Sequence, residues 1–199
     1  PKVSFDFIDN QKISEDKNEL RLLLHLILQI SKHHYRHTDF LSQIEKIILK
    51  YENNIKQTFS NNDLFDIFKS NKILLLFLFE KKIITIDQFI INYLIKKSDT
   101  NHDHYFYPEI KDHLNKKQRE LIEKSFDPSI QTNFEEFRLK GENHFYISSL
   151  IRNDMIEEFV AHVNRNNLPL SSRINPSIFE TNSFLIKKSP SLIEYSAFY

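Results

Sequence analysis

The sequence predicts an all-α protein, and three observations carry that prediction. The 199 residues contain a single glycine, Gly141, and six prolines. Two-residue β-hairpin turns favour glycine because they need a positive φ, so this composition argues against a hairpin-built sheet. Apolar residues recur instead at steps of three and four, which places them on one helix face. Short segments of Asn, Asp and Ser between these stretches predict the turns that join the helices.

The first predicted helix begins after Ser14. Its apolar face recurs at three- and four-residue steps: Leu20, Leu23, Leu24, Ile27 and Ile30. Leu22, Leu26 and Leu28 widen this face, which predicts a central helix buried on most sides. A second stripe follows: Leu41, Ile44, Ile48, Tyr51 and Ile55. Residues 1–13, which include Phe5 and Phe7, are expected to pack as an extended arm.

Capping boxes mark two helix starts in the next stretch. Ser60 and Asp63 open a short helix whose apolar residues are Leu64, Phe65, Ile67 and Phe68. Thr85 and Gln88 form a second box, with Ile84 and Phe89 placed as a hydrophobic staple. The apolar run 73–79 is compatible with a buried strand or a helix when taken alone. Its neighbours favour a helix, so we expect residues 71–81 and 85–97 to form a helix hairpin.

The chain after this hairpin alternates predicted loops and helices. Residues 98–107 are polar and rich in His and Asp, which predicts a loop, and Pro108 suits the first turn of the next helix. Residues 109–126 predict one or two helices that end before Pro128. Residues 129–142 are expected to be irregular, with Gly141 as a hinge.

The last sixty residues predict a helix pair and a final short helix. The pair covers residues 144–152 and 154–165, and the second helix carries Ile156, Phe159, Val160 and Val163 on one face. A linker follows as far as Pro190. Ser191 and Glu194 then form another capping box.

This final helix resembles the first helix of an ankyrin repeat. That family's pattern is Thr-Pro-Leu-His-x-Ala-Ala, then two variable residues and a glycine. Ser191 takes the Thr place, Ile193 the Leu place, and Ser196 and Ala197 the small pair. Leu192 replaces the Pro and Glu194 replaces the His.

The helix pair is also similar to an ankyrin helix–turn–helix, with its turn at residues 153–154. The two turns would be about 46 residues apart, against a usual period of about 33, which implies an insertion over 168–190. Together with residues 68–87 and 176–185, these stretches resemble the ankyrin-repeat proteins of parasitic protists, where a helical region precedes the repeats. The resemblance implies helical hairpins leading into an ankyrin-like α-solenoid. It implies a capping region over 1–140 and a degenerate repeat region over 141–199, truncated at the C-terminus.

Composition argues against several classes of function. Lys and Arg total 27, as do Asp and Glu, and no dense basic run occurs, so nucleic acid is not an expected partner. The single glycine leaves no Walker loop or dinucleotide fingerprint. The absence of cysteine removes disulfides and thiolate sites and is expected of an intracellular, reducing location. The longest purely apolar run, residues 73–79, falls far short of the roughly 20 residues that span a bilayer.

Candidate site residues are few. The one plausible metal constellation combines two groups of side chains: His33, His34 and His37, and His102, Asp103 and His104. Histidine and carboxylate are common ligands, but the turn-like context around Asp103 favours surface histidines. Three carboxylate pairs point to different sides of their helices and are interpreted as solvated: Glu135 with Glu136, Glu157 with Glu158, and Asp63 with Asp66. Ser148 and Ser149 have no evident base. The aromatic group Tyr105, Phe106 and Tyr107 is either core or a sticky surface patch, with core favoured.

The leading hypothesis is therefore a non-enzymatic protein–protein interaction scaffold, or the N-terminal cap of an ankyrin-repeat array. The alternative is a helical His/Asp metal-dependent phosphohydrolase. No catalytic, cofactor-binding or metal-binding residue is assigned, and no cofactor is expected. The expected partner is a protein.

Overall fold

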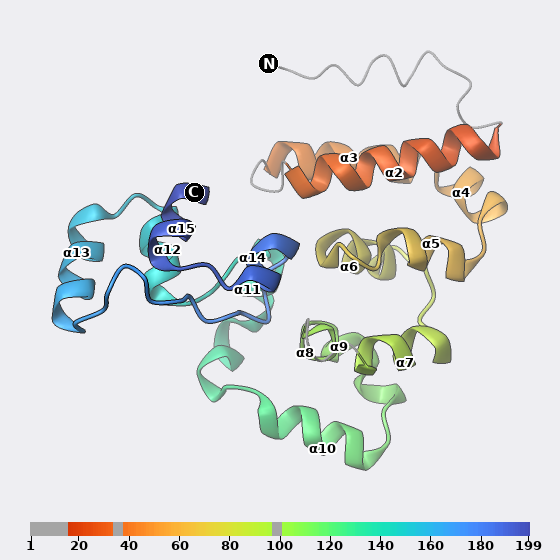
Figure 1. The fold of residues 1–199 in the computed structure, drawn as a ribbon. Helices are drawn as coiled ribbons and strands as arrows, with labels where there is room; N and C mark the ends of the chain where they lie inside the picture. Colours follow the sequence, from red (N-terminus) through yellow and green to blue (C-terminus); the bar gives the residue numbers. More distant parts are fainter. Residues whose placement is uncertain (1–15, 34–37, 97–100) are drawn as a thin grey trace. The chain divides into compact units, whose positions relative to one another are not determined.

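The computed structural model describes residues 16–33, 38–96 and 101–199 (Figure 1). These residues form helices joined by turns, with no strand among them and an isolated bridge between Arg173 and Ser191. The predicted all-α class is confirmed. The chain divides into two compact units, Pro1–Thr85 and Ile86–Tyr199, which are described separately. The predicted arm lies outside the described residues, and the boundary after residue 140 stays a prediction.

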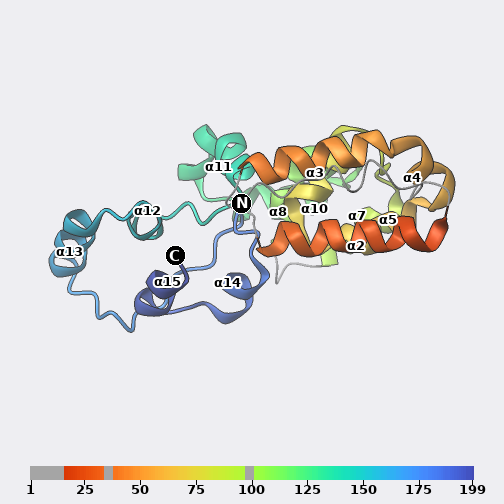
Figure 2. The ribbon, with the colours of Figure 1, turned by 90° about the horizontal axis from the view of Figure 1, so that it is seen from above.

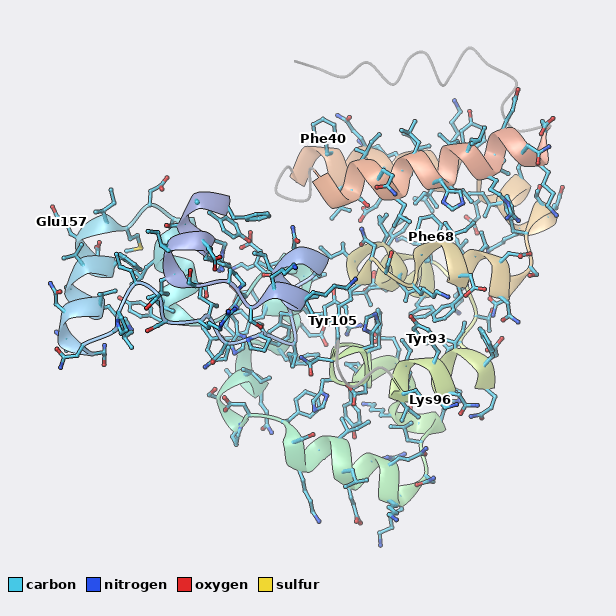
Figure 3. The ribbon with its side chains drawn as sticks, in the orientation of Figure 1. Phe40, Phe68, Tyr93, Lys96, Tyr105 and Glu157 are labelled. Carbon is cyan, nitrogen blue, oxygen red and sulfur yellow. The ribbon has the colours of Figure 1, made fainter. Side chains whose placement is uncertain are left out.

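The first unit stacks two pairs of helices. Its helices are α2 (Lys17–His33), α3 (Thr38–Lys50), α4 (Glu52–Thr58), α5 (Asn61–Phe68) and α6 (Lys72–Glu80). Helix α2 packs against α3 and α5, and α5 packs against α6, so α2–α3 and α5–α6 form two layers (Figure 1). Figure 2 shows α2 and α3 side by side. Phe68, labelled in Figure 3, is one of the wholly buried side chains of this unit.

The predicted apolar stripes form the core of this unit, with one correction. The stripe of α2 is buried from Leu20 to Leu28, and Ile44, Ile48 and Ile55 of the second stripe are almost inaccessible. However, Leu22 is 69% exposed and Leu26 also faces solvent, so the expectation of a helix buried on most sides is wrong. Among the described residues, the helices that pack on α2 are α3 and α5, and residues 22 and 26 lie across the helix from its buried positions.

Helix caps explain where the next elements begin. Ser60 and Asp63 form the predicted capping box, and the predicted helix over 71–81 appears as α6 with Asn71 as its N-cap. The box predicted at Thr85 is wrong, because the Asn61 side-chain amide makes two 2.8 Å hydrogen bonds with the Thr85 backbone. Helix α7 (Gln88–Lys96) begins later, where Asp87 Oδ1 accepts from the Ile90 N–H at 2.9 Å. The boundary between the units falls between α6 and α7, so their hairpin stays a prediction.

The second unit contains more helix than predicted. It continues with α8 (His102–Tyr105), α9 (Tyr107–Ile110), η2 (Lys111–His113), α10 (Lys116–Ser125), η3 (Pro128–Asn133) and α11 (Phe134–Lys140). Pro108 lies in the first turn of α9 as predicted. The loop predicted over 98–107 is wrong from residue 102 onward, because Tyr105 and Phe106 are wholly buried and hold a helical turn in place. The irregular stretch predicted over 129–142 is wrong too, since Phe134 and Phe137 pack on Phe179 and stabilise α11.

The predicted helix pair is confirmed as α12 (Tyr146–Arg152) and α13 (Ile156–Arg165), with Asp154 at a φ of 53° in the turn. Helices α14 (Ser183–Lys188) and α15 (Leu192–Phe198) follow, and α15 packs on α12. A shared core joins them: Ile174, Leu185, Leu192 and Tyr195, with Ile147, Ile151, Phe159, Val163 and Leu168 against it. The segment predicted as a linker is therefore folded onto the pair. Gly141 ends α11 at a φ of 64°, and its carbonyl accepts two bonds from Thr181, so it forms a fixed turn and not a hinge.

Candidate functional site

The helix pair presents an apolar stripe that is half covered. On α13, Phe159 and Val163 pack against the shared core, whereas Ile156 is 70% exposed and Val160 is 48% exposed. No residue of α13 is buried, although its apolar residues follow the helical period closely. Helix α15 has the same two-sided character, because Leu192 and Tyr195 are buried while Ile193 and Phe198 are exposed. The stripe of α13 thus provides an apolar surface that another helix can cover.

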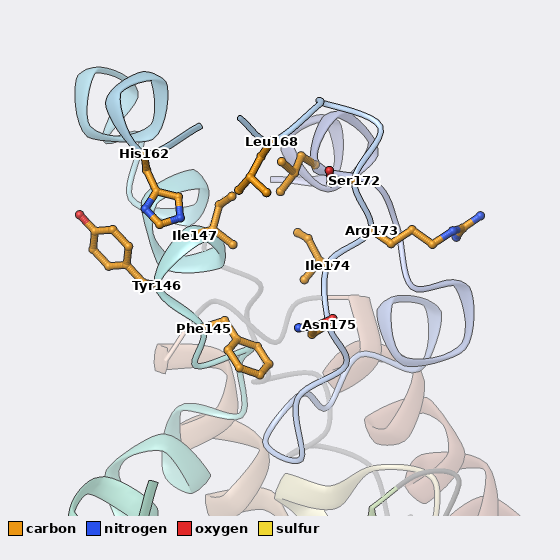
Figure 4. A pocket seen from close by; sticks show the side chains of 10 residues that line it. Phe145, Tyr146, Ile147, His162, Leu168, Ser172, Arg173, Ile174 and Asn175 are labelled. Atoms are coloured by element: carbon orange, nitrogen blue, oxygen red, sulfur yellow. The ribbon is translucent and has the colours of Figure 1, made fainter. Parts of the chain in front are cut away.

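A groove of about 330 Å³ opens beside this pair (Figure 4). Its walls come from α12, α13, the segment before α15 and the first residue of α15. Its main apolar lining residues are Phe145, Tyr146, Ile147, Leu168, Ile174 and Leu192. The Tyr146 and His162 rings meet edge to face at 5.3 Å. Arg173 points away from the groove and donates to the carbonyls of Lys188 and Ser189 (Figure 4). The groove is therefore suited to an apolar group.

The histidine and aspartate residues singled out in the sequence lie in a less exposed setting than expected. His102 is 6% exposed and packs against the rings of Tyr93 and Phe106, so its assignment to the surface is wrong. Tyr105 and Phe106 belong to the core as favoured. His34 and His37 lie outside the described residues. Within the described ranges, no three His, Asp or Glu side chains gather as metal ligands.

His104 lies between two hydrogen-bonding partners. Its Nδ1 is 2.9 Å from Asp103 Oδ1, and its Nε2 is 2.7 Å from Ser125 Oγ at the end of α10. Burial alone would raise the pKa of Asp103, but the hydrogen bonds and charge of His104 outweigh it and the pKa is lowered. The result is a Ser–His–Asp chain. Sequence reasoning missed Ser125, because no pattern links it to a histidine 21 residues earlier.

Two of the three carboxylate pairs have local structural partners. Asp63 belongs to the Ser60 capping box, and Asp66 lies 2.6 Å from the Lys69 ammonium group. Glu136 pairs with Lys140 at 2.6 Å, and Glu135 lies 3.5 Å from Arg138. Glu157, labelled on α13 in Figure 3, is exposed, as is Glu158. These positions fit solvated helix faces.

Two other carboxylates are shielded from solvent, Glu109 partly and Glu180 almost completely. Glu109 lies 2.5 Å from the buried Arg138 guanidinium, yet its pKa is raised because burial outweighs the attraction of that cation. Glu180 is 2% exposed and its Oε1 accepts from the Asn182 N–H at 2.8 Å. Burial raises the pKa of Glu180 from its ordinary 4.5 to about 7. Near pH 7, about half of the molecules therefore carry this carboxyl group in its protonated form.

Comparisons with known proteins yield no relative. No protein-family model matches the chain, no curated protein matches it, and no solved structure matches it. Among the described residues, no helix combines the length and the apolar character that crossing a bilayer requires.

Proposed function

We propose that the chain is a helical protein-interaction module in which α12, α13 and α15 begin an array of helix pairs. The observation that carries this proposal is the half-covered stripe of α13, on which Ile156 is 70% exposed. In a stacked array each helix pair covers the apolar face of its neighbour. The occupant proposed for this stripe is therefore a further ankyrin-type helix pair, with residues 1–140 serving as the cap of the array.

The packing of α15 supports this assignment. Helix α15 lies against α12, and the buried side chains of Leu192 and Tyr195 anchor it in the shared core. Arg152 of α12 donates to the Tyr195 hydroxyl at 3.1 Å. In the proposed array, α12 and α15 are the first helices of successive repeats, and α13 is the second helix of the repeat that α12 begins.

The alternative, a metal-dependent phosphohydrolase, receives no support from the described residues. Both ring nitrogens of His104 already have hydrogen-bond partners, in Asp103 and Ser125. To bind a metal ion, His104 would have to give up its hydrogen bond to Asp103 or its hydrogen bond to Ser125.

Adding two consensus ankyrin-type helix pairs after Tyr199 tests the proposal. We expect the extended chain to melt at a higher temperature than the chain of 199 residues, because the added pair covers the apolar stripe. Ile156→Glu should abolish this gain while changing the unextended chain little, since that side chain is already mostly in solvent.

Leu121→Glu on α10 is the matched control, because Leu121 is 62% exposed and lies outside the helix pair. It should leave the gain intact. Equal melting temperatures for the extended and unextended chains would refute the proposed stacking.

A further inference from the structure

We propose that Ser125, His104 and Asp103 form a nucleophilic serine site that accepts acyl groups from small esters. This site is separate from the helix-pair surface. The three side chains are connected by two hydrogen bonds of 2.7 Å and 2.9 Å. A hydroxyl, an imidazole and a carboxylate in this order can activate serine on any fold, because geometry and not sequence position defines the arrangement.

The ionised carboxylate sets the protonation of the imidazole. An aspartate that is charged accepts hydrogen bonds and donates none, so His104 Nδ1 must carry the proton in the 2.9 Å contact. The neutral ring then has its lone pair on Nε2, which faces Ser125 Oγ. The same hydroxyl also lies 2.8 Å from the Ile122 carbonyl oxygen and 3.1 Å from the Leu121 carbonyl oxygen, so its proton must turn from these acceptors toward Nε2 when the serine reacts. In this tautomer, Nε2 of His104 is placed to remove the proton of Ser125.

The surroundings define the class of ester. Ser125 is exposed, whereas His104 is largely covered, which leaves the hydroxyl as the accessible end of the chain. The Phe126 ring packs on His104 at 4.9 Å, and the Tyr107 ring meets Phe126 at 5.5 Å. Phe126 follows Ser125 in the sequence, and its ring covers the imidazole of the base. This aromatic surface beside the base favours an uncharged ester with a short acyl chain and an aromatic alcohol.

The reaction balances with water as the second substrate. Ser125 Oγ attacks the carbonyl carbon as His104 Nε2 takes the hydroxyl proton. The bond to the leaving alcohol oxygen breaks, and His104 returns that proton to the leaving group, so the acyl group remains on Oγ. Water then attacks the acyl carbon, gives its proton to Nε2 and releases the free acid, and Ser125 recovers its hydrogen. Asp103 holds the ring and stabilises the imidazolium that forms between these steps.

Labelling the full chain with a fluorophosphonate probe tests this site, with the adduct mapped by peptide mass spectrometry. Ser196 is the internal control, because it is also exposed and its hydroxyl donates to the carbonyl three residues earlier at 2.9 Å. General-base activation contributes about 10²–10⁴-fold, so we expect Ser125 to react at least about a hundredfold faster than Ser196. Release of nitrophenol from p-nitrophenyl acetate should accompany this reactivity and disappear in Ser125→Ala.

The supporting variants separate activation from simple exposure. Asp103→Asn keeps the shape of the side chain but removes its charge, and His104→Asn removes the base; each should lower labelling of Ser125 toward that of Ser196. Circular dichroism identifies any variant that fails to fold. If one of the two variants does not fold, the labelling of the other variant tests the proposal. Equal labelling of Ser125 and Ser196 in the native chain would overturn the proposal, as would unchanged labelling in a folded Asp103→Asn variant.

Discussion

Replacing the buried Glu180 with glutamine should make the protein less sensitive to pH. Burial raises the pKa of this carboxyl from 4.5 to about 7, so the folded protein binds the proton more tightly than the unfolded chain. The stability that this proton contributes is fully present below about pH 4.5 and is lost as pH rises through about 7. Glutamine carries no titrating proton and keeps an oxygen that can accept from the Asn182 N–H.

The magnitude follows from the two pKa values. The rise from 4.5 to about 7 corresponds to roughly 3 kcal/mol in total, of which roughly 2 kcal/mol is lost between about pH 5.5 and pH 8. As pH rises across this interval, the free energy of unfolding of Glu180→Gln minus that of the native chain should therefore increase by roughly 2 kcal/mol, because only the native chain loses stability. Urea unfolding, followed by circular dichroism at the two pH values, measures the free energy of unfolding of the native chain and of the variant.

Taking the difference between the two proteins isolates Glu180 from other titrating groups. Glu109 and His144 also have pKa values shifted by burial, but they are present in both proteins and their effects cancel. Glu158→Gln, which changes an exposed glutamate of the same unit, should leave the pH dependence of stability as it is. If Glu180→Gln and Glu158→Gln show the same pH dependence, the assigned role of burial is wrong.

Three further substitutions test the packing and the caps by urea unfolding. Arg138→Met should destabilise the protein by about 3 kcal/mol, because it leaves the Glu109 carboxyl without its buried cation. Adding Glu109→Gln to this variant should restore part of the lost stability. If the effects of the two substitutions simply add, the pairing is contradicted. Ser60→Ala should cost about 1 kcal/mol by removing the capping box of α5, and an unchanged stability would show that the cap contributes nothing. Gly141→Ala should cost about 1–2 kcal/mol, since a φ of 64° is unfavourable for a residue with a Cβ, and Leu139→Ala on the exposed side of α11 serves as its control.

Local signals predicted those elements whose stability is itself local. The capping boxes at Ser60 and Ser191 and the apolar period of α13 are properties of a few neighbouring residues, and the structure contains each of them. Helix α8 shows the opposite case. Its four residues are too few to be stable alone, and the buried ring of Tyr105 holds them in place. A polar composition therefore predicted a loop where long-range packing produces a helix.

Features that depend on contacts distant in sequence were not predictable from one sequence. The bond between His104 and Ser125 joins residues 21 positions apart, and neither residue type is unusual in its own segment. The burial of Glu180 likewise depends on residues 168–190 folding back onto the helix pair. The sequence of this segment predicted an inserted linker instead. The exposed half of α2 was missed because leucine appears on both sides of that helix, and hydrophobicity alone does not specify which side has a partner.

If a further helix pair stacks on α13 as proposed, the folded segment before α15 limits where that pair can bind. The Asn143 amide donates to the Asn175 carbonyl at 2.9 Å, and His144 Nδ1 lies 2.8 Å from Ser177 Oγ. Since Asn143 and Ser177 are buried, these bonds fix the segment against the start of α12. Helix α12 is thus covered by α13, α15 and this segment, whereas α13 keeps its uncovered stripe. An added pair therefore meets a surface that is already ordered, and binding there does not require the ordering of a loop.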